Sequence, residues 1–360
     1  MEMEIANFSD ALINLNESDK EECVEVYENY EELEKWLLGV VALPFILVGL
    51  SANFMSMLIF SHKNMRSNMV NWYLMILAAS DSVILISSFI VLTLPRLGEI
   101  LHFWRLTWIS YYLVPYWYAP MGSAQTISVW MTVAMSLHRF IGVCLPFKAS
   151  ILLNKKRAKV AIIAVVGFAI IFNMTRFFEV EIVRVCRHTP INAELPIFHP
   201  TPLRLSSLYR RLYYEYAYTL VMFVIPFTIL IVVNSMVILA IHKSRQIHAK
   251  LNVYDDGTRK QEIAKEISTS IMLVAIVVAF LLCNTLTFVV NILENWGYPN
   301  YLTMLVPWSN WLVMTNASIN ICIYCMFSDK YRQLFWYYLR VLGCCGCRHD
   351  FEVIVNHTWS

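Results

Sequence analysis

Seven long apolar stretches, separated by short charged segments, dominate this sequence. Each approaches or exceeds the roughly 20 residues that a helix needs to cross the hydrocarbon core of a bilayer. The stretches lack the alternation of barrel strands, and a helix satisfies its own backbone hydrogen bonds in lipid. We therefore expect an all-α membrane protein, a seven-transmembrane helix bundle, with spans near residues 36–61, 69–94, 108–137, 160–178, 216–241, 267–293 and 302–327.

Basic residues predict the orientation of the bundle. The 1–2, 3–4 and 5–6 loops are rich in lysine and arginine, and basic loops stay in the cytoplasm. The 4–5 loop also carries arginines, but long loops translocate largely regardless of charge. We expect a multi-pass plasma-membrane protein with an extracellular acidic tail (1–35), a transmembrane domain (36–327), an amphipathic helix (328–342) and a cytoplasmic tail (343–360).

Two features near the predicted outer face follow from this orientation. Asn7 and Asn16 each begin an Asn-x-Ser triplet, so both are glycosylation acceptors if the tail is extracellular. The fourth stretch is the shortest, and it reaches its predicted length only by including Arg176. The side chain of Arg176 must therefore snorkel to the membrane surface or face other helices.

After the last span, apolar residues at helical spacing predict a short helix on the membrane surface: Tyr331, Leu334, Phe335, Tyr338 and Leu342. Three cysteines follow it, at positions 344, 345 and 347. Thiols beside such a helix suit S-palmitoylation, so we expect Cys344, Cys345 and Cys347 to be acylated. The alternative is a metal site that these thiols form with His349.

Asp81 stands in the middle of span 2, where a charge costs at least ~3 kcal/mol. Either it is a protonated carboxyl hydrogen-bonded in the bundle, or it belongs to a cation or proton site, as intramembrane acids usually do. Ser128, Asn316 and Asn320 offer oxygens from spans 3 and 7, and Asn53 offers another from span 1. A hard cation such as Na⁺ prefers these ligands.

Arg139 lies at the cytoplasmic end of span 3, and Glu266 lies at the cytoplasmic entry of span 6. An ion pair between them would hold the two helices together and break when the helices separate, as a switch requires. The alternative is that each is a solvated boundary charge.

Five motifs occur in order on the predicted spans, and together they resemble the rhodopsin-like (class A) G-protein-coupled receptors across about residues 36–342. They are Gly49-Leu50-Ser51-Ala52-Asn53, Leu77-Ala78-Ala79-Ser80-Asp81, His138-Arg139-Phe140, Pro226 in span 5, and Asn320-Ile321-Cys322-Ile323-Tyr324. Within that family, residues 124–130, 136–149 and 172–179 resemble invertebrate FMRFamide-type neuropeptide receptors.

The resemblance implies roles for several residues already named. It implies a sodium site at Asp81, Ser128, Asn316 and Asn320, and contact with a heterotrimeric G protein through Arg139, Glu266 and Tyr324. Val114 stands where most members have the span 3 cysteine that bonds to the 4–5 loop. The resemblance thus deprives Cys186 of its usual partner and implies a Cys23–Cys186 disulfide that ties the acidic tail over the ligand site.

The chain departs from the family pattern at its switch motifs. Span 6 reads Cys283-Asn284-Thr285-Leu286, without the usual tryptophan and proline, and Ile321 replaces the span 7 proline. Asn234 replaces a span 5 tyrosine, and His138 replaces the acid beside Arg139. Since proline is the commonest cause of sharp kinks, we expect a straighter span 6 and altered activation.

By the resemblance, the ligand binds between the outer halves of spans 2, 3, 5, 6 and 7. Glu215, Glu294 or Glu179 would pair the guanidinium of an RF-amide peptide, and tyrosines and tryptophans would stack on its ring or its cation. The expected ligand-binding residues are Tyr118, Met121, Gln125, Glu215, Tyr218, Phe288, Asn291, Glu294 and Asn310.

The sequence therefore predicts a receptor that binds an extracellular neuropeptide and activates a heterotrimeric G protein. A receptor for a non-peptide ligand and an ion- or proton-translocating seven-helix protein are the alternatives, and Asp81 alone suggests the second. No paired carboxylates, metal-ligand set or nucleophile triad indicates an enzyme. The expected partners are the peptide, the G protein and the lipid bilayer, with no nucleic acid, and the one expected ligand besides these is an allosteric sodium ion.

Overall fold

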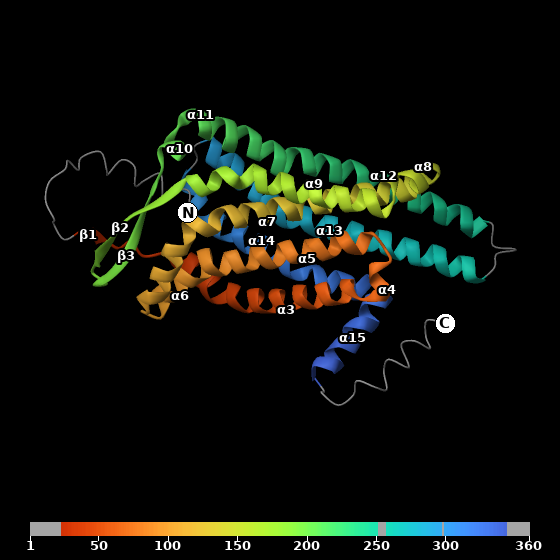
Figure 1. The fold of residues 1–360 in the computed structure, drawn as a ribbon, viewed down its shortest axis with the longest axis horizontal. Coiled ribbons are helices and arrows are strands. Elements are labelled where there is room, and N and C mark those ends of the chain that lie inside the picture. Colours follow the sequence, from red (N-terminus) through yellow and green to blue (C-terminus); the bar gives the residue numbers. More distant parts are fainter. Residues whose placement is uncertain (1–22, 251–256, 297–298, 344–360) are drawn as a thin grey trace.

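The computed structural model describes residues 23–250, 257–296 and 299–343. Within these ranges six helical spans are long and apolar enough to cross a membrane, and a seventh, Tyr301–Phe327, continues past a 111° bend into Asp329–Val341. The helices pack into one elongated bundle, with a small sheet at one end and a projecting helix at the other (Figure 1). The predicted seven-helix bundle is confirmed.

Several spans are built from successive helical segments. Span 1 contains α2 (Glu32–Glu34), η1 (Lys35–Val41) and α3 (Ala42–Ser61), and span 2 contains α5 (Val70–Ser88), η2 (Phe89–Thr93) and α6 (Leu94–Ile100). Span 3 is α7 (Trp104–Cys144), and span 4 is α9 (Lys155–Asn173) with η3 (Met174–Phe178). Span 5 joins α11 (Ser207–Tyr209), η4 (Arg210–Tyr218), η5 (Leu220–Val224) and α12 (Ile225–Lys250). Spans 6 and 7 are α13 (Gly257–Asn295) and α14 (Pro299–Phe327).

The ends of these helices differ from the sequence-based expectation. Span 1 begins at Glu32 and span 5 at Ser207, both before their apolar stretches, because polar and aromatic turns at the end of the bundle near the sheet continue the helix. Span 6 is one continuous helix, while prolines lie inside span 3, at Pro115 and Pro120, and inside span 7, at Pro307. Short helices α4 (Lys63–Arg66) and α8 (Pro146–Leu152) occupy the 1–2 and 3–4 loops.

The 4–5 loop folds as a hairpin, which the sequence did not reveal. Strands β2 (Val180–Thr189) and β3 (Ala193–Pro200) pair antiparallel, and α10 (Pro202–Leu205) leads into span 5. Strand β1 (Val24–Val26) pairs parallel to β2, so the sheet order is β1-β2-β3. The tail that precedes span 1 therefore contributes a strand to a sheet that covers one end of the bundle (Figure 1).

Hydrogen bonds donated by side chains cross the bundle at several levels. Lipid gives apolar helices no hydrophobic reason to associate, so tight packing and such bonds hold transmembrane helices together. Asn53–Ala317 joins spans 1 and 7, Asn173–Thr126 joins spans 3 and 4, and Asn234–Ser136 joins spans 3 and 5. Thr219–Asn291 joins spans 5 and 6, and Ser309–Thr287 joins spans 6 and 7.

Helix α15 (Asp329–Gly343) is the predicted amphipathic helix, and its apolar face is anchored in the bundle. Tyr331 and Leu334 are buried, and the Tyr331 hydroxyl lies 2.7 Å from the Ser56 hydroxyl of span 1. On the other face Trp336 is exposed. Tyr331 therefore anchors the first turn of α15 to the bundle, and the exposed Trp336 is left to contact the membrane surface.

Tyr331→Phe is expected to lower the free energy of unfolding by about 0.5–1.5 kcal/mol, because it removes one buried hydrogen bond and leaves the ring packing intact. Thermal unfolding of the purified protein in detergent measures the shift. Tyr338→Phe is the matched control, since the Tyr338 ring is only half-buried on the same helix. Equal shifts for the two variants would contradict an anchoring role of the Tyr331 hydroxyl.

Candidate functional site

A polar centre joins three spans around Asp81, which is 0% exposed. Ser128 of span 3 donates to one carboxyl oxygen at 3.0 Å, and Asn320 of span 7 donates to the other at 2.8 Å. Three of the four residues expected to bind a cation thus lie in direct contact. The carboxyl group has both oxygens engaged by neutral donors, and no basic side chain pairs with it in the part of the chain that the structure describes.

The two other polar residues named for this centre lie differently. Asn316 is half-buried one turn from Asn320, and its part in cation binding stays a prediction. Asn53 donates through its amide nitrogen to the Ala317 carbonyl at 2.9 Å, and a contact of its amide oxygen with a cation stays a prediction. Asn53 therefore fixes span 1 to span 7 beside the centre, and the distance between these spans depends on it.

Three of the residues expected to bind the ligand are joined in the half of the bundle that carries the sheet. Tyr118 of span 3 and Tyr218 of span 5 both face the Arg176 guanidinium, with ring centroids 5.0 and 5.1 Å from its carbon. Tyr218 contacts Phe223 edge-on at 5.9 Å, and Phe223 stacks on Phe288 of span 6 at 5.3 Å. Rings from three spans thus form one connected aromatic group.

The remaining expected ligand-binding residues are placed less directly. Asn291 is buried and accepts a hydrogen bond from Thr219 at 2.7 Å, so its amide joins spans 5 and 6. Met121 packs on a separate apolar cluster of spans 2 and 3 that contains Val91 and Val114. The others are half-buried, and their part in ligand binding stays a prediction: Gln125, Glu215, Glu294 and Asn310.

Arg176 faces other helices, one of the two alternatives that the short fourth span allowed. It is 7% exposed, and its Nε donates to the Tyr213 hydroxyl at 3.2 Å. Its guanidinium lies against four tyrosine rings, those of Tyr118, Tyr213, Tyr214 and Tyr218. From the sequence only its place near the end of an apolar stretch was evident, and nothing there indicated that four tyrosine rings surround it.

Glu179, considered as a partner for a ligand cation, is engaged by the chain itself. It is 0% exposed and accepts hydrogen bonds from Tyr209 at 2.6 Å and Tyr214 at 2.5 Å. Arg204 of α10 approaches the same carboxylate at 3.7 Å and lies over the Tyr214 ring at 3.9 Å. A ligand guanidinium would have to displace Arg204 to reach Glu179, which leaves Glu215 and Glu294 as the better candidates.

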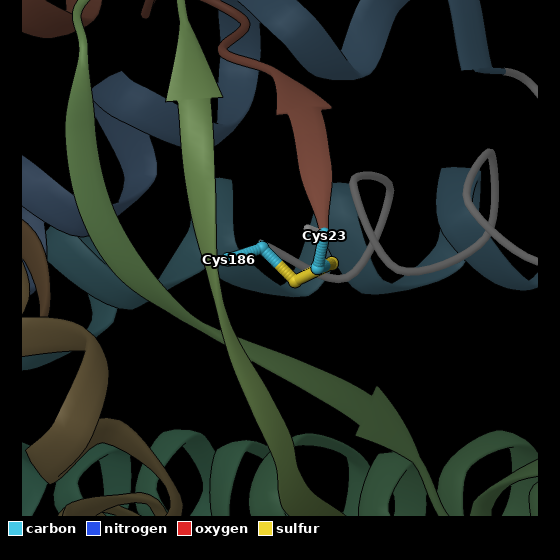
Figure 2. Close-up of a disulfide and its surroundings, with 2 residues drawn as sticks. All are labelled: Cys23 and Cys186. Carbon is cyan, nitrogen blue, oxygen red and sulfur yellow. A yellow bond between two sulfur atoms is a disulfide. The ribbon is translucent and has the colours of Figure 1, made fainter. Parts of the chain in front are cut away.

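The disulfide between Cys23 and Cys186 is present, as the resemblance implied. Figure 2 shows that it joins the beginning of β1 to the middle of β2. Its residues are 163 apart in sequence, so it closes a long covalent loop between the tail and the 4–5 hairpin. Val114, which stands in the usual cysteine position, is buried between apolar residues of span 2.

A second anchor for the tail is Glu99 in the last turns of span 2, which sequence reasoning missed. It accepts hydrogen bonds from the Tyr27 hydroxyl at 3.0 Å and the Tyr30 backbone N–H at 3.1 Å, and it pairs with Lys35 at 3.2 Å. Burial and the nearby Tyr111 and Glu99 raise the pKa of Tyr27, so its hydroxyl stays protonated and donates. A glutamate just past the apolar stretch of span 2 was the available but weak signal in the sequence.

At the other end of the bundle, the structure tests the expected G-protein contacts only in part. Arg139 is half-buried, while the Glu266 side chain lies outside the described residues, so their ion pair stays a prediction. Tyr324 is buried, with its ring against Phe60 at 5.2 Å. Asn234, the residue in place of a span 5 tyrosine, donates to Ser136 at 3.1 Å and joins spans 3 and 5.

The predicted modification sites are not covered by the structure. The expected glycosylation sites, Asn7 and Asn16, and the expected palmitoylation sites, Cys344, Cys345 and Cys347, lie outside the described residues.

Comparison with known proteins identifies the framework. The chain matches the family described as 7 transmembrane receptor (rhodopsin family) over residues 52–324. It is 31% identical to the FMRFamide receptor of Drosophila melanogaster over 87% of this chain and 56% of that protein. It is 30% identical to the probable G-protein coupled receptor frpr-1 of Caenorhabditis elegans over 88% of this chain and 82% of that protein. The FMRFamide peptide receptor frpr-18 of the same nematode is 29% identical over 88% of this chain and 72% of that protein.

The chain thus spans little more than half the length of the Drosophila relative, while it covers most of both nematode relatives. The matched range runs from span 1 to Tyr324 in span 7. It therefore includes the Asp81 centre and the aromatic group that contains Tyr118, Tyr218 and Phe288. The seven spans, the polar centre that joins spans 2, 3 and 7, and this match lead to one conclusion: the protein belongs to the rhodopsin family of seven-transmembrane receptors.

Proposed function

We propose that this protein is a G-protein-coupled receptor of the plasma membrane that binds an extracellular neuropeptide of the RF-amide type and activates a heterotrimeric G protein. The observation that carries the proposal is the similarity to two receptors named for FMRFamide, which extends over 87% and 88% of this chain. The tail lies outside the cell in this proposal, on the same side as the Cys23–Cys186 disulfide, because disulfides persist in oxidising compartments.

The outer end of the bundle has the chemistry that such a peptide needs. An RF-amide peptide presents a guanidinium and an aromatic ring next to each other. The connected rings of Tyr118, Tyr218 and Phe288 offer surfaces on which the ring stacks. Glu215 and Glu294 supply the carboxylates for the guanidinium, and the acidic tail attracts a cationic peptide and raises its association rate.

Activation requires that ligand binding at this end favours a different arrangement of the helices at the other end. The Asp81 centre lies between the two ends and contacts spans 2, 3 and 7 at once. A sodium ion bound there by Asp81, Ser128, Asn316 and Asn320 would stabilise one arrangement. Arg139, Glu266 and Tyr324 would then contact the G protein after span 6 moves, and acylated Cys344, Cys345 and Cys347 would hold α15 to the membrane.

Cells that express the receptor with a G-protein activation sensor are expected to respond to Phe-Met-Arg-Phe-amide or a related amidated peptide. Untransfected cells and cells that express the Arg139→Gln variant serve as controls, and the variant should bind labelled peptide without activating the sensor. A receptor that reaches the surface and responds to no RF-amide peptide would contradict the proposal. Membrane currents in oocytes without added peptide would favour ion translocation instead.

A further inference from the structure

Arg176 is a buried cation whose donors the protein leaves largely unused. A guanidinium has five N–H donors. In the described part of the chain, Arg176 makes one hydrogen bond, from Nε to the Tyr213 hydroxyl at 3.2 Å. It has no carboxylate partner there, although its side chain is 93% buried. None of its nitrogens is among the fully buried atoms that lack a hydrogen-bond partner, so the terminal N–H groups keep an opening through which a ligand can supply the acceptor.

The four surrounding rings compensate the charge but do not replace that partner. Tyr118, Tyr213, Tyr214 and Tyr218 lie with their centroids 5.0 to 5.7 Å from the guanidinium carbon. A ring attracts a cation placed over its face, whereas a hydrogen-bond acceptor must lie near the plane of the guanidinium, where the N–H groups point. The cage therefore stabilises the positive charge and leaves in-plane donors for an acceptor.

The position of Arg176 is fixed from one turn away in the same span. Asn173, which is 0% exposed, donates to Thr126 of span 3 at 2.9 Å and to the Ala169 carbonyl at 2.9 Å. Gly122 makes this close approach possible, because a Cβ there would lie 2.5 Å from the Asn173 amide oxygen and 3.2 Å from the Arg176 side chain. The guanidinium is thus presented at a defined place between spans 3, 4 and 5.

We propose that Arg176 is a specificity-determining residue that donates hydrogen bonds to a carbonyl oxygen at the amidated C-terminal end of the bound peptide. The inference rests on the proposed function and assigns one part of the ligand to one residue. The ligand contacts Tyr118 and Tyr218 in that proposal, and both rings touch Arg176. A neutral carboxamide is an acceptor that reaches a buried cation at a lower desolvation cost than a carboxylate.

The same charge dictates the direction in which the peptide lies. A cationic side chain cannot bind beside Arg176, because two guanidinium groups in a buried site repel each other. The peptide arginine must therefore lie away from the tyrosine cage, toward Glu215 or Glu294, while the terminal carboxamide lies at Arg176. Because the cage excludes cations, it also disfavours amine ligands, so repulsion by Arg176 contributes to ligand specificity.

A double-mutant cycle between receptor and peptide tests the contact. One peptide is Phe-Met-Arg-Phe-amide, and the other ends in a 2-phenylethyl amide, so it keeps the last ring and lacks the terminal carboxamide. The native receptor is expected to lose about 10- to 100-fold in potency toward the truncated peptide, the range of a hydrogen bond to a charged group. Arg176→Met should lose as much toward the intact peptide and then discriminate between the two peptides by less than about threefold.

Arg211→Gln is the matched control, because Arg211 is an exposed arginine of the neighbouring span, and it should keep the full discrimination. Arg176→Lys retains the charge and should reach the cell surface even if the methionine variant does not. Because lysine lacks the planar, forked donors of a guanidinium, this variant should lose less than about tenfold in potency when the peptide lacks its terminal carboxamide. Additive losses, or an unchanged truncation penalty in both Arg176 variants, would overturn the inference. That result differs from failure of the proposed function, in which the native receptor responds to neither peptide.

Discussion

Replacing Cys23 by serine is expected to lower the unfolding temperature of the purified receptor by about 5–15 °C, which corresponds to about 2–5 kcal/mol of lost stability. The reason is the length of chain that the disulfide restrains, since its cysteines have a sequence separation of 163. Without it, the tail is held by the short β1–β2 pairing and by the contacts of Glu99 with Tyr27, Tyr30 and Lys35. Thermal unfolding in detergent, monitored by a dye or by intrinsic fluorescence, measures the shift.

Cys186→Ser and the double variant should give the same shift as Cys23→Ser, because either single change removes the whole bond. Cys322→Ser is the control, since Cys322 is a free, exposed thiol of span 7 and its replacement should leave the unfolding temperature within about 2 °C. Peptide mapping without reduction gives an independent reading. A free Cys186 thiol in the native protein would contradict the pairing and the expected shift.

Asp81→Asn is expected to abolish the effect of sodium on agonist affinity. In the native receptor, sodium should weaken agonist binding by about 5- to 150-fold, the usual range of coupling between two sites. Asparagine keeps the shape of the carboxyl group and can still accept from Ser128, so the bundle should persist. It carries no charge for the cation, and its amide nitrogen opposes the donor of Asn320. Radioligand or labelled-peptide binding at increasing NaCl concentration measures the effect.

Ionic strength must be constant in this experiment, so potassium replaces sodium in the reference series. Ser80→Ala is the matched control, because the Ser80 hydroxyl is buried beside Asp81 but donates to the Leu77 carbonyl of its own helix. It should retain the full sodium effect. Unchanged sodium dependence in Asp81→Asn would reject the cation site and leave Asp81 as a structural hydrogen-bond acceptor between three spans.

The apolar stretches were sufficient to predict the seven spans, because the length of an apolar run and the thickness of a bilayer are both fixed quantities. They were poor guides to the helix ends. The helix of span 5 begins at Ser207, ahead of Arg210 and Arg211. Polar residues at a membrane surface can form the first turns of a helix, so the start of an apolar stretch does not mark the start of the helix. The hairpin from Val180 to Pro200 escaped prediction for a related reason, since its alternation of side chains is interrupted by a β-bulge.

The candidate site divides in the same way. Asp81 was predictable because a carboxyl group in the middle of an apolar run is costly and has few explanations. Its contacts with Ser128 and Asn320 agree with the set of residues that the family resemblance implied. The partners of Arg176 and Glu179 did not follow, because both lie near the ends of elements, where the sequence leaves the direction of the chain open.

The sequence by itself determined that this chain forms a helical membrane bundle with an acid at its centre, since burial in lipid depends on composition along the chain. The tertiary structure alone decided which polar groups meet. Tyr118, Arg176 and Tyr218 come from three different spans, and their meeting depends on helix rotation and on the close packing at Gly122. Such contacts are set by three-dimensional packing, and no spacing along one span records them.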